Sequence, residues 1–95
     1  MREKIRLSEY VLTIHAEEEM ENDGLSIFDI ERVVLNGKII ERQQDKKSAE
    51  WKYRIRGKLS SGLVMDVVTK LSITGKLVIL TVILFNNNIR LKYEM

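Results

Sequence analysis

The sequence predicts an α+β domain in which two N-terminal helices pack on a four-stranded antiparallel sheet. Apolar residues repeat with helical spacing between residues 12 and 36, and from Lys38 onward the apolar pattern becomes that of extended chain. Turn-forming stretches separate four extended segments, and connections this short join antiparallel neighbours. The segment before the first helix leaves room for an extra N-terminal strand.

The length of 95 residues, with 44% hydrophobic content, allows one domain spanning residues 1–95. There is no cysteine, which excludes a disulfide framework and a thiolate zinc site. The first ten residues lack the apolar run of a signal peptide, and the longest apolar stretch, KLVILTVILF, is too short to span a bilayer as a helix. We therefore expect a cytoplasmic protein with no membrane partner.

Two short helices are predicted between residues 13 and 37. The stretch NDG at 22–24 ends the first helix, which begins at residue 13 or 14. Ser26 and Asp29 resemble a capping arrangement at the start of the second helix, and Gly37 ends it. We expect the two helices to form a hairpin with an apolar seam. The stripes that would build this seam are Leu12, Ala16 and Met20 in the first helix and Ile27, Ile30 and Val34 in the second.

Four strands joined by short turns are predicted to follow as an antiparallel meander. Their sequences are KIIERQQ (38–44), EWKYRIRGKLS (50–60), LVMDVVTKLS (63–72) and KLVILTVILF (76–85). The last strand is apolar on both faces until Thr81, so we expect it to be central or well covered.

The second strand carries a row of basic side chains. Because successive side chains of a strand point to opposite faces, one face presents Lys52, Arg54, Arg56 and Lys58. Such a row can be the solvated face of a half-buried strand, but a face that merely keeps a protein soluble mixes charges of both signs. The composition therefore favours phosphate binding. On the other face we expect Trp51 in the core and leave Tyr53 open between core and base stacking.

The register between the second and third strands follows from their charge pattern. Facing residues share a sheet face, and a three-residue loop at 60–62 places Arg56 opposite Asp66 and Lys52 opposite Lys70. The first pair is a salt bridge. The second is unfavourable unless a counter-ion lies between the two ammonium groups.

Charge is divided unevenly along the chain. Residues 1–31 contain nine acidic and three basic side chains, whereas residues 32–95 contain thirteen basic and five acidic ones. The basic part carries the predicted sheet, and this asymmetry is typical of a surface that binds a polyanion.

Three segments resemble a known family: LTIHAEEEMENDGLSIFDIERVVLNGKIIE (12–41), EWKYRIRG (50–57) and GKLVILTV (75–82). They are similar to the domain of unknown function 4258, a small bacterial family that resembles the toxins RelE and MqsR, and the resemblance covers about residues 10–83. It implies a RelE-like fold and cofactor-independent, metal-independent cleavage of mRNA, free or on the ribosome. It also implies a cognate antitoxin, of the type that combines CxxC zinc motifs with a helix-turn-helix. Members commonly carry Arg at the position of Glu19 and an aromatic residue at that of Ile83, and this chain departs from both.

His15 is the only histidine, and so the only side chain whose ordinary pKa suits proton transfer near neutral pH. It could take the proton of a ribose 2′-hydroxyl or hold a phosphate, and the alternative is a histidine at the core border that bonds to backbone. A metal site with Glu18 and Glu19 is disfavoured, because no second histidine, cysteine or aspartate cluster completes it.

RNA cleavage through a 2′,3′-cyclic phosphate needs a proton acceptor, cations that stabilise the charge developing on the phosphate, and a proton donor. The residues predicted to be catalytic are Arg54, Lys70, His15 and Thr81, and those predicted to bind RNA are Lys52, Arg56, Lys58 and Tyr53. Two alternatives remain: a non-catalytic RNA-binding module, and a protein-interaction module whose basic sheet receives an acidic segment.

Overall fold

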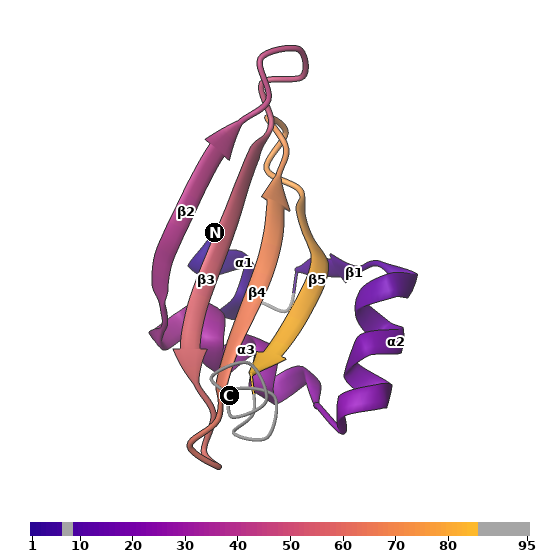
Figure 1. Ribbon diagram of the computed structural model, residues 1–95. Coiled ribbons are helices and arrows are strands. Elements are labelled where there is room, and N and C mark those ends of the chain that lie inside the picture. Colours follow the sequence, from indigo (N-terminus) through magenta and orange to yellow (C-terminus); the bar gives the residue numbers. More distant parts are fainter. Residues whose placement is uncertain (7–8, 86–95) are drawn as a thin grey trace, which may run out of the picture.

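A computed structural model describes residues 1–6 and 9–85 and has an α+β fold with a five-stranded sheet, which confirms the predicted class (Figure 1). The elements are α1 (Arg2–Arg6), β1 (Tyr10–Leu12), α2 (Ile14–Asp23), α3 (Ile27–Asn36), β2 (Lys38–Gln44), β3 (Trp51–Lys58), β4 (Val64–Leu71) and β5 (Leu77–Phe85). The strands β2 to β5 match the four predicted segments to within a residue or two.

The strand order in the sheet is β1-β5-β4-β3-β2. The strands β2 to β5 form the predicted antiparallel meander, and β1 is the extra N-terminal strand, which pairs in parallel with the start of β5. The strand β5 therefore has neighbours on both sides over Leu77–Ile79, as its apolar faces predicted.

Both predicted helices are present, and local side-chain chemistry fixes their ends. The Thr13 hydroxyl accepts a hydrogen bond from the Ala16 backbone N–H (3.0 Å) at the start of α2, and Gly24 ends that helix in the left-handed conformation (φ 65°). At the start of α3, the Ser26 backbone N–H donates to the Asp29 carboxylate (2.8 Å).

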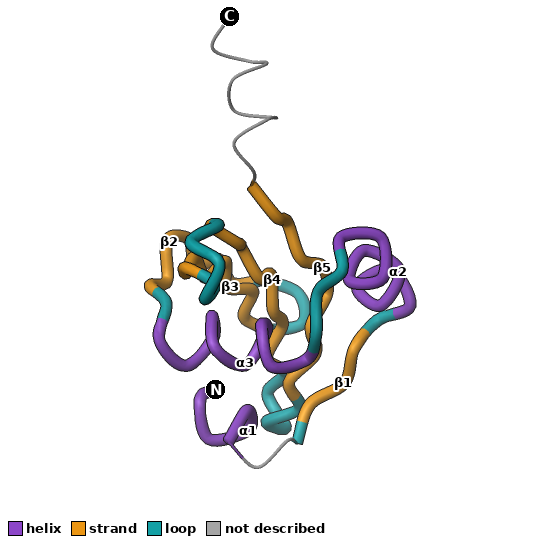
Figure 2. The backbone as a smooth tube through the Cα atoms, turned by 90° about the horizontal axis from the view of Figure 1, so that it is seen from below, coloured by secondary structure: helices purple, strands orange, loops and turns teal. Residues whose placement is uncertain are grey.

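The prediction that the two helices form a hairpin with a shared seam is wrong. The helix α3 packs beneath β3 and β4, next to α1, whereas α2 lies beside β5 at the edge of the sheet (Figure 2). The pairing of β1 with β5 holds α2 at this edge. The hydrogen bonds between the two segments continue to the residue before α2, where the Thr13 N–H donates to the Ile79 carbonyl (3.1 Å). The helix α1, which the sequence analysis did not predict, covers the same sheet face as α3, and its Ile5 is buried.

The core lies between these helices and one face of the sheet, called here the inner face. Its largest buried side chains are Ile5, Ile30, Ile55, Met65, Leu77 and Ile79. A Cβ atom at Gly57 would lie 3.2 Å from the Cα of Val33, so the absence of a side chain there lets α3 approach β3 closely. The opposite face, turned away from α1 and α3, is called the outer face.

Trp51 is on the inner face, as predicted, but it is only partly buried and lies outside the core, so that part of the prediction is wrong. The turn between β2 and β3 projects beyond the helices (Figure 1), and Trp51, at the start of β3, is not among the side chains that pack against the core. Trp51 instead stacks on Tyr53, with ring centroids 6.2 Å apart, and the Arg42 guanidinium lies 5.4 Å from its ring.

Candidate functional site

The register between β3 and β4 is the one predicted from charge. Lys52 lies opposite Lys70, and Arg56 lies opposite Asp66. Because buried Val67 and Thr69 point to the inner face, these four charged residues share the outer face.

Asp66 is fully buried on the outer face and holds two arginines. Arg54 Nε donates to its Oδ2 (2.6 Å), and Arg56 donates to both carboxylate oxygens, from Nε (2.7 Å) and from the terminal nitrogen (2.9 Å). Burial opposes the charged form of Asp66, but the bonds from Arg56 and Arg54 outweigh it and hold the pKa of Asp66 below its ordinary value. Arg54 was predicted to contact the scissile phosphate, and in the structure its Nε already bonds Asp66.

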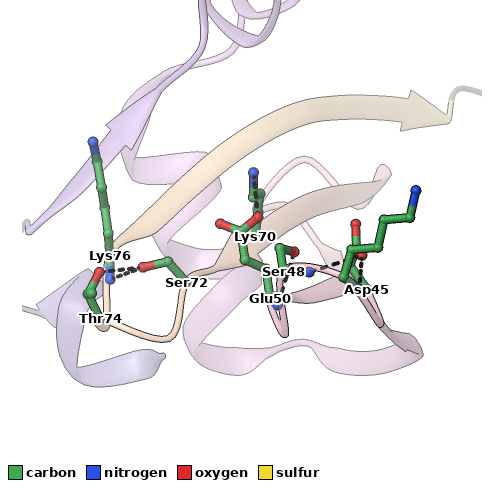
Figure 3. A network of polar contacts seen from close by, with 8 residues as sticks. Asp45, Ser48, Glu50, Lys70, Ser72, Thr74 and Lys76 are labelled. Carbon is green, nitrogen blue, oxygen red and sulfur yellow. Dashed lines mark hydrogen bonds and ion pairs between the residues drawn. The ribbon is translucent and has the colours of Figure 1, made fainter.

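Lys70 also has a partner, Glu50, whose Oε1 lies 3.0 Å from its Nζ (Figure 3). The turn before β3 sets this contact. The Asp45 carboxylate accepts from the backbone N–H groups of Lys47 (2.8 Å) and Ser48 (3.3 Å), and the Ser48 hydroxyl accepts from the Glu50 N–H (3.3 Å). Those backbone bonds, with smaller contributions from the charges of Lys70 and Lys52, lower the pKa of Asp45. Glu50 is thus the counter-ion that the facing lysines require.

The outer face keeps a positive balance despite these pairs. By the strand register, β2, β3 and β4 contribute six cations and two carboxylates to it, and the turn before β3 adds the Glu50 carboxylate, which leaves three uncompensated positive charges. The cations are Lys38, Lys52, Arg54, Arg56, Lys58 and Lys70, and the carboxylates are Glu41, Glu50 and Asp66. A surface of this charge attracts a polyanion.

A hollow of about 570 Å³ lies at the end of the sheet where β2 turns into β3. It is lined by Gln43, Gln44, Asp45, Lys46, Glu50, Trp51, Lys52, Lys70 and Leu80. A smaller hollow of about 190 Å³ shares Gln43 and Lys52 with it and extends along β3 to Arg54 and Val68. The two facing lysines therefore stand in a concave surface rather than on a flat one.

A second polar cluster lies where α2 meets β5. The Oε1 atom of Glu19 accepts from the Val82 backbone N–H (3.3 Å) and from the Thr81 hydroxyl, and His15 Nε2 lies 3.1 Å from it. His15 is 66% exposed, whereas Glu19 is 28% exposed. Glu19 therefore brings together two predicted site residues, His15 and Thr81, that are far apart in the sequence.

This cluster reaches the outer face through Thr81. Thr81 lies opposite Val68 on β4, and Val68 lies opposite Arg54 on β3. Two strand spacings separate the backbones at Thr81 and Arg54 by about 10 Å. The other predicted residues lie apart: Lys58 is opposite Val64 at the far end of β3, and Tyr53 is on the inner face.

Two residues that sequence reasoning missed complete these sites. Glu50 immediately precedes β3 and lies two positions before Lys52. The alternation of side chains that predicts the basic row therefore also places the Glu50 carboxylate on the outer face. Glu19 follows His15 by four residues, which predicts their contact on a helix, but no local signal predicts the approach of Thr81.

Within residues 1–6 and 9–85, no helix is long and apolar enough to cross a membrane. The same residues contain no group of three or more His, Cys, Asp or Glu side chains placed to hold a metal ion.

The family model described as domain of unknown function (DUF4258) matches residues 12–84. This match contains α2, α3 and the whole antiparallel meander except Phe85, the last residue of β5. No curated protein and no solved structure matches the chain.

Proposed function

We propose that this chain, which belongs to the DUF4258 family, is a cytoplasmic toxin that binds RNA on the outer face of its sheet and cleaves it without a metal ion. The single observation that carries this proposal is the concave, positively charged surface around the facing residues Lys52 and Lys70. RNA is the polyanion that such a surface attracts, and its 2′-hydroxyl allows cleavage without any cofactor. The resemblance to RelE and MqsR supports the same activity.

In the proposed reaction, Lys70 and Arg54 stabilise the charge that develops on the scissile phosphate. Each is held by a carboxylate before RNA binds, Lys70 by Glu50 and Arg54 by Asp66. Arg54 keeps its terminal nitrogens for the phosphate, because only its Nε donates to Asp66. Lys52 and Arg56 bind the flanking phosphates.

A second candidate, a non-catalytic RNA-binding module, is favoured by one observation. Both Arg54 and Arg56 donate to the same buried carboxylate, an arrangement that stabilises the sheet whether or not RNA is present. In this case the outer face would bind RNA through charge alone, and each of its cations would contribute a similar amount to the RNA affinity.

The partner proposed for the toxin is a cognate antitoxin that covers the outer face, of the CxxC zinc and helix-turn-helix type that the family resemblance implies. Co-expression with the adjacent gene should then relieve growth inhibition and yield a stable complex. High-yield expression of the chain alone without growth inhibition would contradict the toxin role.

The nuclease proposal is tested by comparing Arg54→Ala and Lys70→Ala with the matched control Lys58→Ala, in the presence of a chelator. We expect the first two variants to lose about 10²-fold or more in single-turnover cleavage rate, with only a modest loss of RNA affinity. Lys58→Ala should weaken binding and leave the rate at saturating RNA nearly unchanged. Equal small losses of affinity in all three variants, without a distinct loss of rate, would favour the binding module.

A further inference from the structure

We infer that Glu19 is the proton acceptor for the ribose 2′-hydroxyl, with His15 as the residue that positions it. This inference rests on the proposed function and adds to it the group that the cationic face does not supply. Arg and Lys side chains can stabilise phosphate charge, but transfer of the 2′ proton needs a base close to the reacting ribose.

The contacts of Glu19 fix one carboxylate oxygen and leave the other available. Oε1 receives hydrogen bonds from Thr81 and the Val82 backbone N–H, and His15 Nε2 lies 3.1 Å from the same oxygen. Within the described part of the chain, no donor is bonded to Oε2. A carboxylate held by two donors on one oxygen, with His15 beside it, is already oriented, which lowers the cost of presenting the second oxygen to a substrate.

The location of Glu19 suits this role because it is where α2 meets the outer face. Thr81 extends from β5 onto that face, in the cross-strand row that continues through Val68 to Arg54. A ribose placed beside Thr81 would have Glu19 on one side and its 3′ phosphate directed toward Arg54 and Lys70. With 28% of its side chain exposed, Glu19 can be reached by a ligand from solvent.

The reaction is balanced without a further reagent. The 2′ oxygen forms a bond to phosphorus as its proton passes to Glu19, and the bond from phosphorus to the 5′ oxygen breaks. The 5′ oxygen takes a proton from water, and Glu19 returns its proton to solvent. The products are a 2′,3′-cyclic phosphate and a 5′-hydroxyl.

The rival explanation is structural: Glu19 satisfies the Val82 N–H at the edge of β5 and so attaches α2 to the sheet. Glu19→Gln separates the two roles, because the amide oxygen can still accept from Val82 but cannot take a proton at neutral pH. Glu18→Gln is the matched control, since Glu18 is exposed and precedes Glu19 on the same helix.

We would measure three quantities for wild type, Glu19→Gln and Glu18→Gln: single-turnover cleavage rate of an RNA oligonucleotide, affinity by fluorescence anisotropy, and thermal unfolding. The expected result is a loss of about 10²-fold or more in rate for Glu19→Gln, with affinity within about three-fold of wild type. Glu18→Gln should match wild type in every measurement.

His15→Gln is a second test variant. A loss of its activity would not be explained by misfolding, because the exposed ring of His15 contributes little to packing. We expect a loss of about three- to ten-fold in rate without a change in unfolding temperature. A rate for Glu19→Gln and His15→Gln equal to that of Glu18→Gln, while Arg54→Ala is inactive, would overturn this inference and leave the proposed function intact. Absence of RNA cleavage by the wild-type protein would overturn both the inference about Glu19 and the proposed nuclease function.

Discussion

Lys52 and Lys70 face each other across β3 and β4, and the carboxylate that relieves their repulsion comes from Glu50, whose Oε1 lies 3.0 Å from Lys70 Nζ. Two ammonium groups in this position require a negative partner. In the free protein Glu50 occupies the place beside Lys70 that we propose for a phosphate group of RNA. RNA that binds here must therefore compete with an internal carboxylate for Lys70.

Replacing Glu50 with Gln should strengthen RNA binding for this reason. The variant removes the competing charge while keeping the size of the side chain, so we expect up to about five-fold higher affinity, the scale of an exposed ion pair. The dependence of the affinity on salt should steepen as well, because one more cation becomes available to phosphate. Anisotropy titrations at several salt concentrations would measure both effects.

The matched control for Glu50→Gln is Glu18→Gln, which changes the net charge equally on an exposed site of α2. If both variants raise the affinity by the same factor, the gain comes from net charge and Glu50 does not lie over the phosphate site.

Asp66 predicts a dependence of stability on pH. The pKa of its carboxyl is lower in the folded protein than its ordinary value of about 3.9, so the unfolded chain binds this proton more readily. The stabilisation by the Arg54–Asp66–Arg56 cluster is therefore fully present above about pH 4 and is lost as the pH falls through the lower folded-state pKa. Asp66→Asn should cost about 2 kcal/mol at pH 7, because the half-exposed arginines can recover part of their hydration.

Urea unfolding at pH 7 and at pH 3 would check this prediction, with Asp23→Asn, an exposed site on α2, as the control. The difference between wild type and Asp66→Asn should shrink at pH 3, whereas the control should match wild type at both values. An undiminished difference at pH 3 would mean that packing around Asp66, rather than its charge, accounts for the loss.

The register and the strands were predictable because they depend on patterns that repeat along the chain. Alternation in β3 and the short turn after it placed Lys52 opposite Lys70 from the sequence alone. The position of α2 was not predictable in the same way. It depends on the parallel pairing of a three-residue strand with β5, and so short a segment carries almost no periodic signal.

The candidate site also has a part that the sequence predicts and a part that it does not. The cations of β3 follow from alternation, but their partners depend on contacts between segments distant in sequence, such as Thr81 with Glu19, 62 residues apart. Trp51 illustrates a further limit. Its face was predicted by alternation, yet its partial exposure depends on how far the β2–β3 turn extends beyond the helices.

Trp51 supplies a direct test of where RNA binds. It is the only tryptophan in the chain, and it lines the larger hollow together with Lys52 and Lys70. The indole itself is on the inner face and only partly buried, but RNA bound in the hollow should still change its surroundings, so we expect the tryptophan emission to shift or weaken in a saturable way. The midpoint of this change should agree with the affinity from anisotropy.

Two variants make the fluorescence test specific to this end of the sheet. Lys52→Ala should weaken binding by about three- to ten-fold and reduce the emission change at a fixed RNA concentration, because it removes one phosphate contact from the hollow that Trp51 also lines. Lys58→Ala removes a cation of the same strand at its far end, so its bound state should show the full emission change even where its affinity is lower. If RNA binds by anisotropy while the Trp51 emission of wild type stays constant, RNA lies near Arg56 and Lys58 instead, and the hollow at Lys52 and Lys70 is not its site.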